Sequence, residues 1–189
     1  GLFAELAHYH QGIHLLASDY QDLGERVLKN VIANQKHLSR ALFGHALEGR
    51  CRGIPGVICG AGPSLNGVLP KLAEVQDRGL IFAGGSAVAA LNMAHITPHF
   101  CAHLDPDPPR ERFLSHQAFE VPHVYQSRFS SSLLEQVHGP LIWMAEGGSY
   151  PIERWIDEQY GISAPPFPAG WSVVNFCAAI AVHLGCDPI

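Results

Sequence analysis

The chain has 189 residues, of which 47% are hydrophobic and 15% are charged, and its formal net charge is −5 with histidine neutral. The apolar fraction is sufficient for a full core, which excludes disorder for most of the chain, and the basic residues are too few and too scattered for a broad nucleic-acid-binding face. No apolar run approaches the roughly 20 residues that a membrane span needs.

The first part of the chain, residues 1–48, contains no proline, and its apolar residues recur at steps of three and four. This periodicity predicts an amphipathic helix or a pair of helices. The first residues lack the basic region and the cleavage site of a signal peptide. Residues 49–56 are rich in glycine and predict a linker.

From residue 56 onward, short apolar runs alternate with helical patterns. Strands are predicted at residues 56–60, 79–85, 100–104, 121–127 and 140–146. Helices are predicted at residues 68–76, 86–94, 151–161 and 172–184, with two shorter ones after the third and fourth strands. We expect Pro70 in the first turn of its helix and Ser86 as an N-cap. Strands that are apolar on both faces and alternate with helices predict a Rossmann-like α/β fold, with a mostly parallel sheet covered on both faces.

These patterns divide the chain into an N-terminal helical segment, residues 1–48, and a Rossmann-like nucleotide-binding domain, residues 49–189. Residues 186–189 are typical of the opening of a further strand, and the chain begins with Gly rather than Met. We therefore expect a segment of a longer protein, truncated at the C-terminus of the domain. The five cysteines form no CxxC pair, which predicts reduced, buried thiols and a cytoplasmic location.

Ligands of open α/β sheets bind beyond the carboxyl ends of the strands. The turn after the first predicted strand consists of Gly60, Ala61, Gly62, Pro63 and Ser64. Its glycines allow close approach of a ligand, and the N-terminus of the following helix suits a phosphate. It is neither a Walker loop nor the full dinucleotide fingerprint, because Leu65 replaces the third glycine. The alternative interpretation is a tight turn without a ligand.

Two further turns repeat the arrangement of glycine, hydroxyl and helix. Gly85 and Ser86 follow the second strand, and Gly170 and Ser172 precede the last helix, with Asn175 one turn further on. Each of them could be an ordinary helix cap. The glycine–serine turns after the first and second predicted strands, which are neighbours, nevertheless favour one shared anion or nucleotide site.

Asp105 follows the third predicted strand. Its carboxylate could bind a ribose hydroxyl, Mg²⁺ or a substrate, although Asp-Pro pairs also initiate turns. His103 lies two residues earlier and is a second candidate catalytic residue. Asp107 is expected to be a solvated turn residue, and residues 146–149, after the fifth strand, are a weaker candidate for ligand contact.

Three stretches carry a family resemblance: GVICGAGPSLNGVLPKL, LIFAGGSAVAALNMAHITPHFCAHLDPDP and GWSVVNFCAAIAVHLGCDPI. In this order they resemble the 6-hydroxymethylpterin diphosphokinase MptE-like family, also known as domain of unknown function 115, over residues 40–189. That family includes bacterial motility accessory factors, which look like glycosyltransferases that add nonulosonic sugars to flagellin. The first turn is also distantly similar to GNGPSL of bacterial sialyltransferases.

The resemblance implies roles for the residues of these turns. The residues implied to hold nucleotide phosphates or to shape their pocket are Gly60, Gly62, Pro63, Ser64, Gly85, Ser86 and Ser172. Asp105 is implied to face substrate or metal. The chain departs from the family at two places: His99 stands where an aspartate is usual, and the chain stops before the Gly-x-Asp turn of the next strand.

The expected function is that of a nucleotide-binding transferase domain, glycosyltransferase-like, with a CMP-linked nonulosonic sugar as donor and a protein or glycan as acceptor. One alternative is an ATP-dependent 6-hydroxymethylpterin diphosphokinase, with a pterin acceptor and Mg²⁺. Another is a non-catalytic nucleotide-binding or scaffold module. A dehydrogenase is disfavoured, because Gly84 and Gly85 close the second strand where an acidic residue would hold a ribose.

Overall fold

The computed structural model of the chain describes residues 2–114, 118–145, 150–165, 167, 169–170 and 172–189; the side chains of residues 2–9, 11–16, 112 and 114 are not described. Within this part, the strands form one six-stranded sheet in the order β1-β6-β5-β4-β3-β2. The strands are β1 (Leu42–Phe43), β2 (Gly56–Cys59), β3 (Leu80–Gly84), β4 (Phe100–His103), β5 (His123–Tyr125) and β6 (Leu141–Trp143). Every neighbouring pair is parallel.

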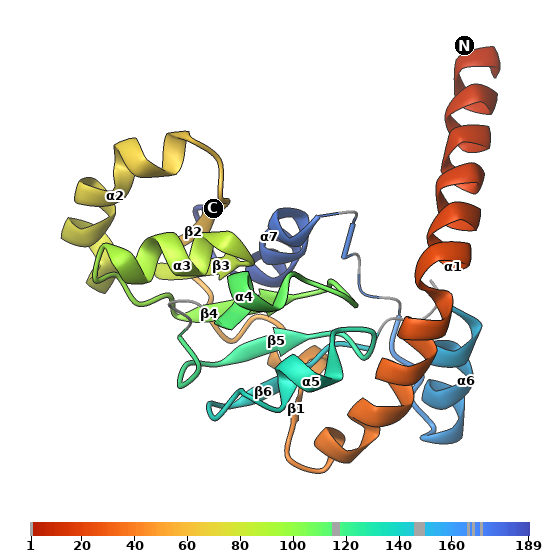
Figure 1. Cartoon of the computed structure of the whole chain (residues 1–189). Coiled ribbons are helices and arrows are strands. Elements are labelled where there is room, and N and C mark those ends of the chain that lie inside the picture. The colour runs from red at the N-terminus through yellow and green to blue at the C-terminus, as the bar shows by residue number, and fades with distance from the viewer. Residues whose placement is uncertain (1, 115–117, 146–149, 166, 168, 171) are drawn as a thin grey trace.

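Helices cover both faces of the sheet (Figure 1). They are α1 (Leu2–Leu38), α2 (Ser64–Val75), α3 (Ser86–Met93), α4 (Arg110–Leu114), α5 (Ser131–Leu134), α6 (Pro151–Gln159) and α7 (Val173–Leu184). From β2 to β6 the chain always steps to the next strand in one direction, and right-handed crossovers then place the intervening helices on the same face. The Rossmann-like α/β fold predicted from the sequence is confirmed.

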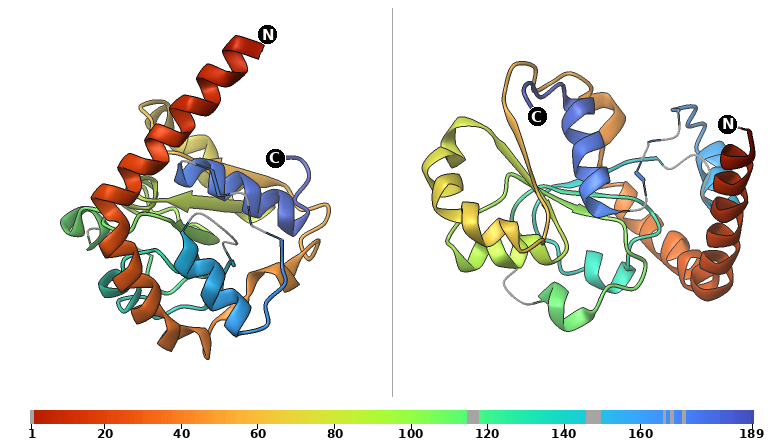
Figure 2. Two further views of the ribbon diagram at one scale, coloured as in Figure 1. Left: turned by 90° about the vertical axis from the view of Figure 1, so that its right-hand side faces the viewer. Right: turned by 90° about the horizontal axis from the view of Figure 1, so that it is seen from above.

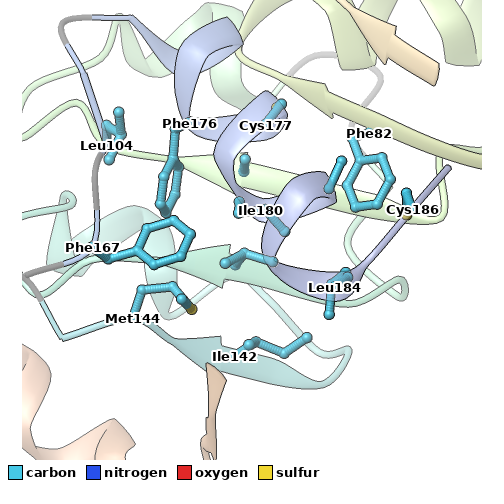
Figure 3. Close-up of a cluster of buried hydrophobic side chains, with 13 residues drawn as sticks. Phe82, Leu104, Ile142, Met144, Phe167, Phe176, Cys177, Ile180, Leu184 and Cys186 are labelled. Atoms are coloured by element: carbon cyan, nitrogen blue, oxygen red, sulfur yellow. The ribbon is translucent and has the colours of Figure 1, made fainter. Parts of the chain in front are cut away.

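The core has two layers because successive side chains of a strand point to opposite faces. On one face, Ile81 and Cys101 pack with buried residues of α2 and α3. On the other face, Phe82 packs with α7, whose buried positions Phe176 and Ile180 recur at helical spacing (Figure 3). Removing each of these large side chains from water contributes about 1.5–3 kcal/mol. This packing fixes the start of α7 above the carboxyl ends of the strands.

Most of the N-terminal segment is a single α-helix, α1, rather than a pair. The N-terminal turns of α1 extend away from the rest of the chain, while its later part lies beside α6 (Figures 1 and 2). Val27 and Val31 pack there with Tyr150 and Ile156. Among the described residues, no helix has both the length and the hydropathy required to cross a bilayer.

Several predicted boundaries are wrong. α2 begins at Ser64 rather than 68, so Pro70 lies inside the helix and not in its first turn. Pro70 and Asn66 are both exposed, so water can reach the carbonyl that the proline leaves without an N–H partner. The N-cap of α3 is Gly85, and Ser86 is the first helical residue.

Both ends of the predicted domain also differ from expectation. β1 lies inside the predicted helical segment and pairs with β6; a two-residue strand is too short to leave a periodic pattern. Residues 186–189 form no strand, although Asp187 N donates to Ile54 O at 3.1 Å and Gly56 N to Pro188 O at 2.8 Å. All five cysteines are free, and four are buried. Burial raises the pKa of the Cys59 thiol to about 11, so this thiol stays protonated at neutral pH.

Candidate functional site

A pocket of about 380 Å³ lies at the carboxyl ends of β3 and β4. The predicted candidates that line it are Gly85, Ser86, His103, Asp105, Gly170 and Ser172. Segments on both sides of the sheet therefore meet at one place, as expected for a parallel α/β sheet. The volume falls within the usual range of small-molecule sites, roughly 300–1,000 Å³.

Two helix N-termini border this pocket. Gly85, the N-cap of α3, has a φ of +54° and a ψ of −131°, a conformation that glycine adopts at little cost and other residues rarely adopt. Ser172 caps α7, and its Oγ accepts a hydrogen bond from Asn175 N at 3.3 Å. Each N-terminus carries unsatisfied N–H groups and a partial positive charge. The pocket is therefore suited to an anionic group.

Gly84 allows the two N-termini to come together. A Cβ at this position would lie 2.2 Å from Val173 Cγ2 and 2.8 Å from Ala102 O. Only a residue without a side chain therefore lets the first turn of α7 rest against the end of β3. Gly84 belongs to the glycine turn predicted after the second strand, but no local pattern in the sequence predicts this packing role.

The first glycine turn is placed differently. Gly60 and Gly62 follow the edge strand β2 and do not line the pocket, and Ala61, Pro63 and Ser64 do not line it either. Residues 61–64 are exposed. A Cβ on Gly60 would lie 3.0 Å from Val174 Cγ2, so this turn also borders the first turn of α7.

Asn175 is also outside the pocket lining. It is exposed, and a Cβ on Gly170 would lie 2.9 Å from Asn175 Cβ. Its backbone N–H bonds to Ser172, so Asn175 supports the cap of α7.

The position of Asp105 agrees with both interpretations of the sequence, a residue at the ligand site and a residue that begins a turn. It lines the pocket, and its Oδ1 accepts a hydrogen bond from Asp107 N at 2.9 Å, which is a turn interaction. Asp105 is exposed, so its carboxylate is accessible to a ligand. Asp107, expected to be a solvated turn residue, forms an exposed ion pair with Arg26 of α1.

His103 is buried at the pocket wall, and its Nε2 lies 2.6 Å from His123 Nδ1. His123 Nε2 lies 2.9 Å from Ala118 O, and a carbonyl only accepts, so His123 carries its proton on Nε2. His123 Nδ1 then accepts from His103 Nε2–H. Burial lowers the pKa of His103 well below its usual range and lowers that of His123 to about 4. Both rings are therefore neutral near pH 7.

The pocket lining also contains residues that were not predicted from the sequence, among them Arg128, Asp19 and Leu23. Arg128 follows β5, and the rule that ligands bind beyond the carboxyl ends of the strands also applies to this position. Asp19 and Leu23 come from α1, and no local pattern places that helix at the pocket. The Asp19 carboxylate accepts a hydrogen bond from Tyr150 Oη. Burial and this hydrogen bond raise the pKa of Tyr150.

The described part of the structure offers few side chains that could bind a metal ion. Among the described residues, no group of three His, Cys, Asp or Glu side chains could hold a metal ion. The predicted candidate at residues 146–149 lies outside the described residues. Of the described residues, Asp19 and Asp105 are the carboxylates that line the pocket, and Mg²⁺ is commonly held by one or two carboxylates together with substrate phosphates.

Comparison with protein families identifies a matching family. The sequence model described as 6-hydroxymethylpterin diphosphokinase MptE-like matches residues 25–189. The matched region begins within α1 and, of the described pocket residues, leaves out only Asp19 and Leu23. No match was found among curated proteins.

Among solved structures, the chain is similar to the MAf glycosyltransferase from Magnetospirillum magneticum AMB-1, with a TM-score of 0.54 and 16% sequence identity. The similarity covers 77% of this chain and 25% of that chain. This chain therefore corresponds to about a quarter of its neighbour, and at this identity the likeness concerns the fold.

Proposed function

The chain belongs to the 6-hydroxymethylpterin diphosphokinase MptE-like family, and from that premise we propose that its pocket binds the phosphate part of a nucleotide donor for a group-transfer reaction. The observation that carries the proposal is the convergence of the α3 and α7 N-termini on a pocket that also contains Arg128 and Asp105. Phosphate oxygens bind at helix N-termini, where N–H groups and the helix dipole act together. Arg128 supplies the cationic side chain for the same charge.

The chemistry follows from the placement of these groups. When the bond between the transferred group and the donor phosphate breaks, negative charge develops on the phosphate. The N–H groups of the two helices, the hydroxyls of Ser86 and Ser172, and Arg128 stabilise that charge from fixed positions. The acceptor oxygen forms the new bond and loses its proton. Asp105 is our first candidate to receive it, because its carboxylate is exposed; His103 is the second.

We propose a CMP-linked nonulosonic sugar as donor and a protein or glycan as acceptor. The support is the motif resemblance to motility accessory factors and the fold likeness to a MAf glycosyltransferase. In this proposal the exposed first turn, Gly60 to Ser64, contacts the part of the nucleotide that extends past the start of α7. Gly62 has room for such a contact, because a Cβ there would meet only Ser64 Oγ at 3.8 Å.

The second candidate is ATP-dependent diphosphate transfer to a pterin alcohol, which the name of the family favours. Such a reaction uses Mg²⁺ to neutralise the phosphates. Asp105 and Asp19 would hold the ion together with the phosphate oxygens.

A thermal-shift panel with CMP, CDP, UDP, GDP, ATP and AMP, each with and without Mg²⁺, tests the proposal. A ligand at 100 times its dissociation constant adds about 2.7 kcal/mol of stability. We expect a CMP-selective shift without Mg²⁺, whereas a Mg²⁺-dependent ATP shift would favour the diphosphokinase. Absence of any shift would count against nucleotide binding and favour the scaffold alternative.

A further inference from the structure

Helix α1 is joined to the loops at the pocket by Asn30, whose side-chain amide both donates and accepts hydrogen bonds. Asn30 Nδ2 donates to Pro106 O and to Arg128 O, each at 3.0 Å. Asn30 Oδ1 accepts from Ser131 N at 3.2 Å. One side chain thus joins the loop after β4 to the loop after β5, which lie 76 and 98 residues away in the sequence.

A second asparagine, one helical turn later, repeats the contact. Asn34 Nδ2 donates to Ser127 O at 2.9 Å and to Phe129 O at 2.8 Å. These two carbonyls flank Arg128 in the chain. Together the two amides therefore bind three successive carbonyls of the loop that carries Arg128.

These hydrogen bonds are buried, so they contribute more to the free energy of docking α1 than the ion pairs nearby. Asn30 is 7% exposed and Asn34 is 1% exposed. Beyond the ends of β4 and β5 the loop carbonyls have no sheet partner, and a buried carbonyl without a donor costs roughly 1–3 kcal/mol. The ion pairs of α1 with Asp107 and Glu135 are exposed, and such pairs contribute little.

We infer that α1 is a wall of the ligand pocket and that Asn30 and Asn34 are positioning residues for Asp105 and Arg128. Asp105 precedes Pro106, whose carbonyl Asn30 binds, and Ser130 N donates to Asp105 O at 3.4 Å. Asn30 and Asn34 therefore act as a clamp that fixes both loops relative to each other. The same helix contributes Asp19 and Leu23 to the lining. The expected effect on ligand affinity rests on the proposed function; the expected effect on the loops does not.

The variant Asn30→Asp tests the clamp with almost no change in shape, because it keeps the acceptor for Ser131 and removes both donors. Asn30→Ala is the second variant in case the new carboxylate prevents folding. Leu72→Ala is the control: Leu72 is buried on α2, so its loss destabilises the protein, but it does not line the pocket.

The first readout is hydrogen–deuterium exchange of the unliganded proteins. We expect faster exchange in residues 104–109 and 126–131 of the Asn30 variants, and no selective change there in Leu72→Ala. Unchanged exchange in those two segments, or an equal change throughout the chain, would overturn the inference.

The second readout is the affinity for CMP and for ATP with Mg²⁺, measured by calorimetry at a temperature where all variants are folded. We expect about a tenfold loss in the Asn30 variants, since small displacements of positioned groups have effects of this order, and less than about twofold in the control. Equal affinity of the Asn30 variants and the wild type would refute the positioning role. If the wild type binds neither nucleotide, the proposed function fails, and the exchange experiment still decides whether the clamp exists.

Discussion

The glycine turns after β2 and β3 are similar in sequence but differ in surroundings. The turn after β2 follows an edge strand, is exposed, and lies outside the pocket. The turn after β3 follows an interior strand, faces the start of α7, and lines the pocket. A glycine–serine pattern therefore indicates a turn, whereas the neighbouring strands and helices decide whether that turn becomes part of an enclosed site.

The largest effect expected from this difference is on stability, at Gly84. Gly84→Ala places a methyl group against Val173 and the Ala102 carbonyl, and we expect a loss of about 3 kcal/mol, near the upper end for overpacking. The control is Gly67→Ala in α2, where a Cβ meets nothing within 4 Å; it should gain roughly 0.5–1 kcal/mol. Urea unfolding measures both, and equal stability of the two variants would contradict the tight contact.

The second effect is the loss of stability in acid, which originates on the pocket side of the sheet. The unfolded chain protonates His123 below its ordinary pKa of 6.5, whereas the folded protein holds that pKa at about 4. Above about pH 6.5 the free energy of unfolding therefore has its full value. It decreases as the pH falls from about 6.5 towards 4, by up to about 1.4 kcal/mol per pH unit for each such histidine.

The variant His123→Gln checks this origin, because a glutamine can still donate to Ala118 O and does not titrate. We expect urea unfolding between about pH 7 and pH 5 to show a shallower pH dependence in His123→Gln than in the wild type. An unchanged slope would show that other groups cause the acid sensitivity.

A smaller effect is expected at the cap of α7. Ser172→Ala removes the Oγ that accepts from Asn175 N and should cost about 1 kcal/mol. Ser172→Asn retains a capping oxygen and should restore most of the stability, but not the hydroxyl that we assign to the phosphate. Thermal unfolding and CMP titration of both variants separate the two roles; recovery of both properties in Ser172→Asn would argue against the phosphate contact.

The smallest stability change belongs to the first turn. Gly62→Ala should alter the free energy of unfolding by less than about 0.5 kcal/mol, as is usual for exposed sites, because only Ser64 Oγ lies near the added methyl group. Any loss of CMP affinity then reflects a direct effect on ligand binding rather than a loss of stability. We expect a severalfold loss; wild-type affinity would exclude the first turn from the site.

The fold could be predicted because most of its strands lie in short apolar runs that alternate with helical patterns, and the family resemblance based on the motifs is confirmed. β1 could not be predicted, since two residues form no period. The pocket lining was predicted where residues directly follow strands, as at Ser86 and Asp105.

What the sequence does not predict is the long-range packing at the pocket. Asp19 and Leu23 reach the site because α1 docks there through Asn30 and Asn34, whose partners lie 76–101 residues away. Polar residues on an amphipathic helix normally face solvent, so nothing local distinguishes these two asparagines from solvated ones.

The central claim is that the pocket between α3 and α7 holds the donor phosphate with the help of Arg128. Calorimetric titration of CMP into the wild type, Arg128→Gln and the control Ser163→Ala, an exposed serine outside the pocket, tests it most directly. Loss of a hydrogen bond to a charged group costs about 1.5–3 kcal/mol, so we predict at least about a tenfold loss of affinity in Arg128→Gln and none in Ser163→Ala. Wild-type affinity in Arg128→Gln, or no binding of CMP to any of the three proteins, would contradict the account.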